Sequence, residues 1–443
     1  MIKTGADPSP ASQSSAISNS SRLRILLLAE PCNPTWSSVP LVGYNIVRAL
    51  ANRKDLDITL ATHIRNRSAL ENDPLMGLAD IHFIDNDWLA SPAYQLSRFL
   101  RGGSGSGWTI NTAMAYPSYI AFEWQTFRHF SQEINQGEFD LIHRVTPVSP
   151  VICSPMVRWT KTPVIIGPIN GGLPWPREFD ELRRREKEWL LPFRKVSRLL
   201  PYFSSMYRHA AAIIYASKHT GMEIPKGKGK RYWVPENGVD PERFPLAERW
   251  RPPQGPFQFI SVGRFAAGKG FNMILEVLSR SEVLADCRFV LVGDGEERFK
   301  LEAIIKEKGL QGRVELPGWL DQPTLAAKLH ASQAFVFPSV KEFGGGVVME
   351  AMSAALPSIV SDYGGPGETV TAESGIKLRM ANREYLTKSL QEAMEKLVQH
   401  PELCAQMGKA AVDRVKTEFL WSAKAEKLVA IYRETLVSAA TPS

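Results

Sequence analysis

Short apolar runs alternate along the chain with longer segments of mixed polarity, and the alternation restarts once near the middle. The runs of the first half lie at residues 23–29, 58–62, 81–84, 141–143, 164–167 and 212–215, and those of the second half at 259–262, 289–292, 314–316, 334–338 and 358–360. Apolar strands separated by helical segments are typical of parallel sheets with helices on both faces. The pattern therefore predicts an α/β protein with two doubly wound halves.

The segments between these runs set the expected boundaries. Residues 1–21 are rich in Ser, Ala and Pro without an apolar core segment, so we expect a disordered tail and no signal peptide. The halves are predicted at 22–240 and 241–420, and the GGSGSG stretch at 102–107 predicts a flexible loop. Helical periodicity marks 42–52, 272–278 and 297–308, and only helices are expected from residue 383 onward. We expect the last segment, 421–443, to form a helix that packs back on the first half.

Composition narrows the compartment and the partners. The 443 residues are 44% hydrophobic and 22% charged, as in ordinary soluble proteins, and no apolar run approaches the roughly 20 residues of a membrane-spanning helix. The net charge of +7 fits an anionic ligand or an acidic membrane surface, and no nucleic-acid recognition motif accompanies it. Because the four cysteines lie far apart without metal-binding spacing, we expect reduced thiols in the cytoplasm.

The stretch 334–368 carries the clearest candidate chemistry. An apolar strand leads into a loop with Lys341 and Glu342 and three glycines, and a helix is predicted from about Val347, with Glu350 in its first turn. Glycines let backbone N–H groups approach an anion, and a helix N-terminus favours negative charge. The stretch therefore predicts a phosphate site in the cleft between the halves, where strand ends meet. A dinucleotide enzyme is disfavoured, because the loop 30–40 contains no G-x-G-x-x-G.

An ordered set of short motifs in the second half completes this pattern. They are Asn237-Gly238-Val239-Asp240, Gly263-Arg264-Phe265 with Lys269-Gly270, Gly293-Asp294-Gly295, Gly318-Trp319, and the acids Glu342 and Glu350. In this order they resemble the family 4 glycosyltransferases of GT-B fold, strongly over residues 255–380 and more weakly before. The resemblance implies two Rossmann-like domains that face each other across a cleft, the first for the acceptor and the second for a nucleotide-sugar. It also implies transfer with retention at the anomeric carbon, without a metal or other cofactor.

The resemblance assigns roles to individual residues. Arg264 and Lys269 match the cations that hold the diphosphate, Glu342 the acid that binds donor sugar hydroxyls, and Glu350 the acid that binds the ribose diol. The remaining expected donor contacts are Gly263, Phe343, Gly344, Gly345, Gly346, Val347 and Trp319. Simpler interpretations stay open: a loop Arg and Lys, an acid that stabilises a helix start at Glu350, and a core Trp319. Glu368 is expected to be a helix-start residue rather than a catalyst.

The chain departs from the family in the first half. Many members carry a His in the loop after the strand at 164–167, and here that loop has none. We expect Asn170, Gly171 and Gly172 to line the acceptor side of the cleft. His143, at a predicted strand end, is either a candidate to assist there or a hydrogen-bonded structural residue. At the start of the acid motif, Phe343 stands one place earlier than in many members, so the identity of the donor sugar stays open.

The expected reaction moves a hexosyl unit from a UDP- or GDP-sugar to an acceptor hydroxyl in polysaccharide, glycolipid or other glycoconjugate synthesis. The acceptor is a glycan, a lipid-linked sugar or a small molecule. Residues 177–208 mix basic and apolar side chains, which fits either a peripheral contact with the inner membrane face or a solvated helical hairpin. The alternatives are a non-catalytic sugar- or nucleotide-binding protein and a nucleotide-sugar epimerase. Asp85 and Asp87 are interpreted as loop acids.

Overall fold

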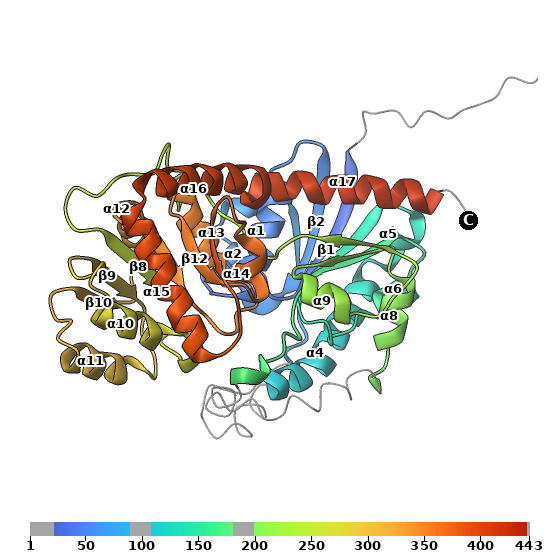
Figure 1. Ribbon diagram of the computed structural model, residues 1–443. Coiled ribbons are helices and arrows are strands. Elements are labelled where there is room, and N and C mark those ends of the chain that lie inside the picture. Colours follow the sequence, from blue (N-terminus) through green and yellow to red (C-terminus); the bar gives the residue numbers. More distant parts are fainter. Residues whose placement is uncertain (1–21, 89–107, 180–198, 441–443) are drawn as a thin grey trace, which may run out of the picture.

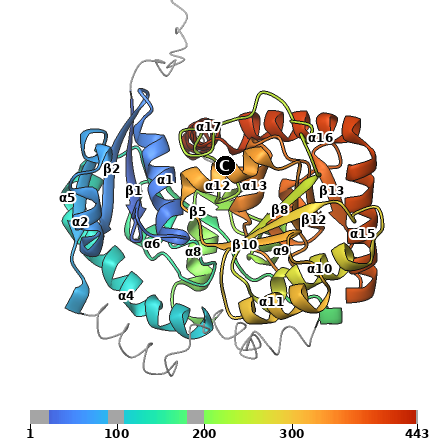
Figure 2. The ribbon, with the colours of Figure 1, turned by 90° about the vertical axis from the view of Figure 1, so that its left-hand side faces the viewer.

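The computed structural model describes residues 22–88, 108–179 and 199–440. Two parallel sheets, each covered by helices on both faces, lie side by side (Figure 1 and Figure 2). The predicted fold class of two doubly wound halves is confirmed. The expectations for residues 1–21, for the loop at 102–107 and for most of the basic segment 177–208 fall outside the described residues.

The first sheet has seven parallel strands in the order β3-β2-β1-β4-β5-β6-β7. Their bounds are β1 Leu23–Ala29, β2 Leu56–His63, β3 Asp80–Ile84, β4 Leu141–Thr146, β5 Val164–Ile169, β6 Ala212–Tyr215 and β7 Lys230–Trp233. Every residue of β4 and β5 is buried, as expected for strands covered on both faces. The edge strand β7 was not predicted, because its sequence KRYW has no apolar run and none of its residues is fully buried.

The second sheet has six parallel strands in the order β10-β9-β8-β11-β12-β13. Their bounds are β8 Gln258–Val262, β9 Arg288–Val292, β10 Val314–Gly318, β11 Ala334–Phe337, β12 Ser358–Ser361 and β13 Gly375–Leu378. β13 was also missed, since Lys377 interrupts a run of only four residues at the sheet edge. Both sheets reverse their strand order beside the first strand, which creates the crevice where ligands of such folds bind.

Helices and short helical turns connect the strands. The helices are α1 Val39–Ala51, α2 Arg67–Leu70, α4 Trp108–His129, α5 Ser131–Gln136, α6 Met156–Trp159, α8 Phe203–His209, α9 Lys218–Glu223, α10 Phe271–Arg280, α11 Arg298–Glu307, α12 Gln322–Ala331, α13 Gly346–Ser353, α14 Gly364–Thr369, α15 Arg383–Gln399, α16 Pro401–Arg414 and α17 Trp421–Ala440. The shorter turns are η1 Ile64–Asn66, η2 Pro74–Gly77, η3 Arg177–Phe179, η5 Ala267–Lys269 and the π-turn η6 Val415–Phe419.

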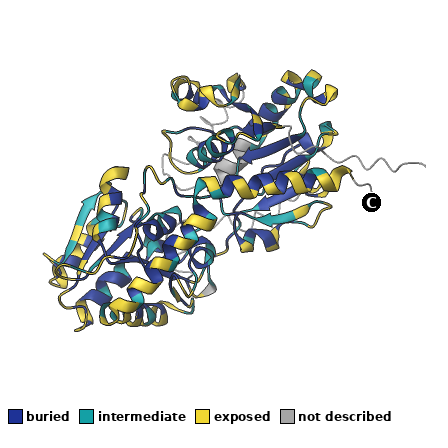
Figure 3. Ribbon diagram, turned by 90° about the horizontal axis from the view of Figure 1, so that it is seen from above, coloured by how far each residue is buried: buried dark blue, intermediate teal, exposed yellow. Residues whose placement is uncertain are grey.

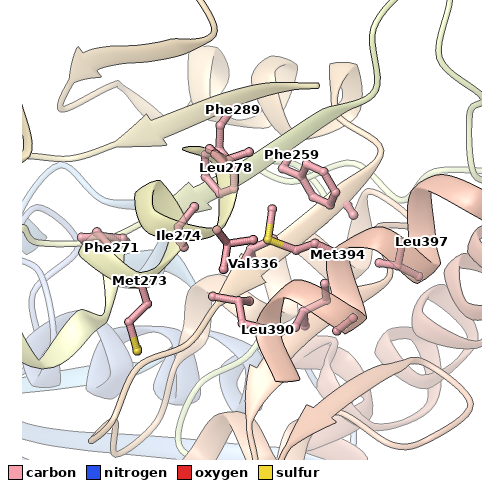
Figure 4. Packing of buried hydrophobic residues seen from close by; sticks show 14 of the residues in the cluster. Phe259, Phe271, Met273, Ile274, Leu278, Phe289, Val336, Leu390, Met394 and Leu397 are labelled. Carbon is pink, nitrogen blue, oxygen red and sulfur yellow. The ribbon is translucent and has the colours of Figure 1, made fainter. Parts of the chain in front are cut away.

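Apolar residues pack on both faces of each sheet, and the exposed residues lie on the outer faces of the helices (Figure 3). In the second half, Phe259 and Phe289 of the sheet pack with Leu390 and Met394 of α15 (Figure 4). Burial of one such side chain stabilises the fold by about 1.5–3 kcal/mol. The sheets are therefore rigid supports for the loops at their strand ends.

The C-terminal helix α17 returns from the second half to the first (Figure 1). Before it begins, Val239 pairs with the end of η6, where its N–H donates to the Phe419 carbonyl at 2.8 Å. Leu428, Ile431 and Tyr432 of α17 then join the core of the first half. The chain thus crosses twice between the halves at one place. Within the described residues, no helix has both the length and the apolar character needed to cross a membrane.

Candidate active site

The glycine loop between β11 and α13 is shaped by close backbone packing. Gly345 adopts a left-handed conformation at φ 64°, which favours glycine, and α13 begins at the next residue. A Cβ at Gly344 would lie 2.4 Å from Glu236 Oε1, so this position has no room for a side chain. On the opposite side, the Gly365 N–H donates to the Glu342 carbonyl at 3.2 Å. The glycine loop at 344–346 and the second glycine turn at 364–367 are therefore held against each other at the strand ends.

The two predicted diphosphate cations each contact a carboxylate. Lys269 ends η5, and its Nζ forms an ion pair with Glu342 on the glycine loop. Arg264 follows β8 and pairs with Glu296 at 3.0 Å, with both side chains half exposed or more. The structure therefore brings Lys269 and Glu342 together beside the glycine loop. Arg264 reaches the surface, where its partner is screened by solvent.

Glu350 lies in the second turn of α13, because the helix begins at Gly346. The prediction that it occupies the first turn was wrong, and the simpler role of stabilising the helix start loses its basis. Burial raises the pKa of this carboxyl from 4.5 to about 7. Among the described residues, no side-chain or backbone group forms a hydrogen bond or ion pair with its carboxylate. Glu350 is thus a partly buried acceptor that is open to a ligand.

The other predicted donor contacts lie on the glycine loop, at the start of α13 and directly after the strands β8 and β10. Lys341 Nζ lies 5.5 Å from the centroid of the Phe343 ring and 5.0 Å from the centroid of the Trp175 ring. Trp319 follows β10 with 62% of its surface exposed, so its interpretation as a core residue was wrong. Val347 packs partly buried against the core, and Gly263 directly follows the strand β8. An exposed indole at the strand ends can stack on a planar ring.

Asn170 follows β5 and is almost fully buried. Its Oδ1 accepts hydrogen bonds from Ser217 Oγ and Thr220 Oγ1, and its Nδ2 donates to Glu236 Oε1 at 2.6 Å. The Gly171 N–H donates to Thr220 Oγ1 at 3.1 Å, and the Gly172 carbonyl contacts His219 Nε2 at 3.2 Å. The loop predicted to line the acceptor side is therefore fixed by α9 and by the segment that follows β7.

His143 does not line a cleft. The strand β4 continues to Thr146, three residues beyond the predicted end, so His143 lies in the middle of a buried strand with no exposed surface. Its ring nitrogens contact Tyr432 Oη and the Gly167 carbonyl, both at 2.6 Å, and burial lowers its pKa to about 4. A neutral ring with both nitrogens bonded cannot assist a substrate. The structural alternative is the correct one, and the catalytic candidate was wrong.

Glu368 lies near the end of α14, so its prediction as a helix-start residue was wrong. Its two carboxylate oxygens accept from the Lys218 backbone N–H at 2.8 and 2.9 Å, and Trp233 Nε1 donates at 3.2 Å. Both donors belong to the first half. Together with the bond from Tyr363 Oη to the Pro174 carbonyl at 2.7 Å, this contact joins the halves beside the site.

Sequence reasoning missed the residues that hold the site from a distance. These are Ser217, His219, Thr220, Glu236 and Glu368. Only the position of Glu236, directly before the Asn237-Gly238-Val239-Asp240 motif, was a signal that could have found one of them. Asp87 donates its backbone N–H to Asp85 at 3.0 Å, as expected for loop acids. In the ranges that the structure describes, no three metal-ligating side chains gather.

Known proteins resemble this chain in sequence. Residues 243–414 match the family model described as glycosyl transferases group 1. The chain is 26% identical to α-D-kanosaminyltransferase of Streptomyces kanamyceticus over 308 residues, which is 69% of each chain. It is 29% identical to glycogen synthase of Mycobacterium tuberculosis over 234 residues, which is 52% of this chain and 55% of that enzyme.

Solved structures share the whole architecture. Sucrose-phosphate synthase from Thermosynechococcus elongatus superposes with a TM-score of 0.62 at 18% identity, over 95% of this chain and 100% of that one. Anabaena HepE in complex with UDP and glucose superposes with a TM-score of 0.56 at 16% identity, over 94% and 100%. The fold is therefore the GT-B architecture. The match of residues 243–414 to the model of group 1 glycosyl transferases, together with the named relatives, identifies the chain as a glycosyltransferase.

Proposed function

We propose that the protein transfers a hexosyl unit from a nucleotide-sugar to an acceptor hydroxyl with retention at the anomeric carbon. The observation that carries the proposal is the glycine loop itself: it combines the Lys269–Glu342 pair with the unpartnered carboxylate of Glu350 on the following helix. These groups offer a cation, a sugar-binding acid and a ribose-binding acid around backbone N–H groups. A nucleotide diphosphate-sugar needs all four.

The charge of the leaving diphosphate decides the mechanism. As the glycosidic bond breaks, negative charge grows on the diphosphate, where Lys269 Nζ, Arg264 and the N–H groups of Gly345 and Gly346 stabilise it. The acceptor oxygen forms a bond to the anomeric carbon on the face that the diphosphate leaves, and the proton of the acceptor hydroxyl passes to the leaving phosphate oxygen. When the donor binds, its diphosphate pairs with Lys269 in place of Glu342. The Glu342 carboxylate is then free to accept hydrogen bonds from the hydroxyls of the donor sugar. These steps are proposed to need no metal or other cofactor.

Support for the donor class comes from the relatives. HepE binds UDP and glucose, and the matched relatives include a kanosaminyltransferase and a glycogen synthase. We therefore propose a UDP- or GDP-hexose as donor and a glycan, a lipid-linked sugar or a small hydroxyl compound as acceptor. The product then enters polysaccharide, glycolipid or another glycoconjugate. All four cysteines are buried and unbridged, which supports the proposed cytoplasmic compartment.

A transfer assay tests this function. The protein is incubated with UDP-, GDP- and ADP-hexoses and a panel of sugar acceptors, with and without EDTA, and NMR reports the anomeric configuration of the product. The proposal predicts a retained linkage from one nucleotide class, unaffected by EDTA. Release of an epimerised donor without acceptor contradicts transfer, and so does nucleotide binding without turnover for every acceptor. Loss with EDTA that Mg²⁺ or Mn²⁺ restores contradicts the metal-free steps.

A further inference from the structure

Glu236 is a buried acid that the proposed reaction does not yet use. It follows β7 by three residues, at the start of the segment that leads from the first half to the second, and only 9% of its surface is exposed. Its Oε1 accepts from Asn170 Nδ2 at 2.6 Å. A carboxylate so deeply buried is costly unless its bonds serve the structure or the chemistry.

The orientation of Asn170 is fixed by its other partners. Ser217 Oγ donates to Asn170 Oδ1 at 3.1 Å, and the single proton of Thr220 Oγ1 is shared between Asn170 Oδ1 at 3.2 Å and the Gly171 carbonyl at 2.9 Å. The amide nitrogen must therefore face Glu236, where it needs an acceptor. Because Gly171 also bonds to Thr220, the Glu236 carboxylate is tied to the whole loop at the end of β5.

The glycine loop lies against the same carboxylate from the second half. A Cβ at Gly344 would approach Glu236 Oε1 to 2.4 Å and Asn237 Nδ2 to 2.2 Å, and a Cβ at Gly346 would approach Asn237 Cγ to 3.2 Å. The bare backbone of the donor loop therefore rests directly on Glu236 and Asn237. One side chain thus touches the acceptor-side loop and the donor-side loop at once.

A lysine from α17 balances this acid. Lys424 is buried, its Nζ donates to the Pro235 carbonyl, and burial lowers its pKa to about 7, while the charge of Glu236 acts against this shift. Burial raises the pKa of Glu236, and the charge of Glu342 acts in the same direction. The charged groups around Glu236 are thus Lys424 behind it and Glu342 on the glycine loop.

We propose that Glu236 is a positioning residue for the transfer reaction, whose carboxylate holds the Asn170 loop and the Gly344–Gly346 loop in one fixed arrangement. This inference rests on the proposed function. Transfer requires the donor sugar on one loop and the acceptor hydroxyl beside the other to be held at reacting distance, about 3–3.5 Å, and in the right orientation. Displacements of about 1 Å reduce such rates by about a hundredfold.

Kinetics of two Glu236 variants test the proposal. Glu236→Ala is expected to lower kcat at least about tenfold with donor KM changed less than about threefold, because donor contacts remain while their placement is lost. Glu236→Gln keeps an oxygen that accepts from Asn170 and is expected to stay within about threefold of wild type. The matched control is Glu242→Ala, an exposed acid of the same segment that pairs with Arg48 at 3.2 Å. Its kinetics should be unchanged.

Other kinetic outcomes would overturn the inference. One is a Glu236→Ala enzyme that turns over within about twofold of wild type, and another is a Glu236→Gln enzyme as slow as Glu236→Ala, since then the charge matters and not the bond to Asn170. Asn170→Ala removes the same bond from the other side. It should reproduce the loss in kcat without adding to it in the double variant.

Hydrogen–deuterium exchange separates this inference from the proposed function. In Glu236→Ala, the backbone amides of residues 168–172 and 341–349 should both exchange faster than in wild type, and those of Glu242→Ala should not. The exchange experiment needs no substrate, so it can be done even if the wild-type protein shows no transfer. Absence of transfer would contradict the proposed function but not the positioning role. Unchanged exchange in either segment would overturn the positioning role.

Discussion

His143 in the first half is fully buried and Glu350 in the second is partly buried, and the pKa of each is shifted, yet their surroundings differ. Burial shifts both toward neutrality, with a pKa of about 4 for His143 and about 7 for Glu350. The His143 ring has a partner at each nitrogen, whereas no group in the described chain bonds to the Glu350 carboxylate. Burial alone therefore does not identify a functional residue. The unfilled bonding capacity distinguishes the candidate ligand-binding group from the structural one.

The largest expected effect lies in the second half, at the Lys269–Glu342 pair. Lys269→Ala and Glu342→Ala should each reduce kcat/KM at least about a hundredfold, because each removes a group that stabilises the transition state. Lys388→Ala, which breaks an exposed pair with Glu392 on α15 in the same half, is the control and should be nearly neutral. Near-normal turnover of either site variant would remove these residues from the proposed site.

His143 should affect stability and its pH dependence instead of turnover at neutral pH. Its folded pKa of about 4 lies below the ordinary value of 6.5, so the unfolded chain binds more protons between these values and stability falls as the pH falls. From pH 7 to pH 5 this group should cost about 2 kcal/mol. Urea denaturation should show a shallower acid-side loss in His143→Gln than in wild type. Equal slopes would contradict the neutral, bonded ring.

Glu350→Gln should show the opposite pH dependence. Its folded pKa of about 7 lies above 4.5, so the folded protein binds the extra proton and stability falls as the pH rises through this window. The amide removes the buried charge, so the variant should be more stable than wild type by about 1–2 kcal/mol at pH 8 and equal to it at pH 4, in the same denaturation experiment. A destabilised variant at pH 8 would indicate a bonded, structural carboxylate.

The smallest effect concerns the surface pair of Arg264 and Glu296. Glu296→Gln frees the guanidinium for the diphosphate, and donor KM should fall about two- to threefold, because exposed pairs are weak. The matched control is Glu302→Gln on the following helix α11, where Glu302 pairs with Arg298 at 2.9 Å. An unchanged KM in steady-state kinetics would indicate that Arg264 does not reach the donor.

The same contrast explains what the sequence could predict. Buried strands show as apolar runs, so both sheets were predicted apart from the short, charged edge strands β7 and β13. The glycine loop was predicted because its backbone conformation and close packing require glycine, and the three residues Gly344, Gly345 and Gly346 are visible in the sequence.

Partners far apart along the chain are not visible in local patterns. Glu236 meets Asn170 across 66 positions, and Glu368 meets Lys218 across 150. His143 was misplaced because a strand end was set three residues early, since Arg144 is a buried charge that breaks the apolar run. The Arg144 guanidinium donates hydrogen bonds to the carbonyls of Ile152 and Pro147, and no sequence pattern indicates these bonds.

The central claim is that Glu350 and the glycine loop bind a nucleotide diphosphate, and calorimetric titration tests it most directly. UDP, GDP and ADP are titrated into wild type, Glu350→Ala and the control Glu242→Ala. We predict that one nucleotide binds wild type and the control equally, and Glu350→Ala at least about tenfold more weakly, through lost bonds to the ribose. Equal affinity of wild type and Glu350→Ala for every nucleotide that binds would contradict the account.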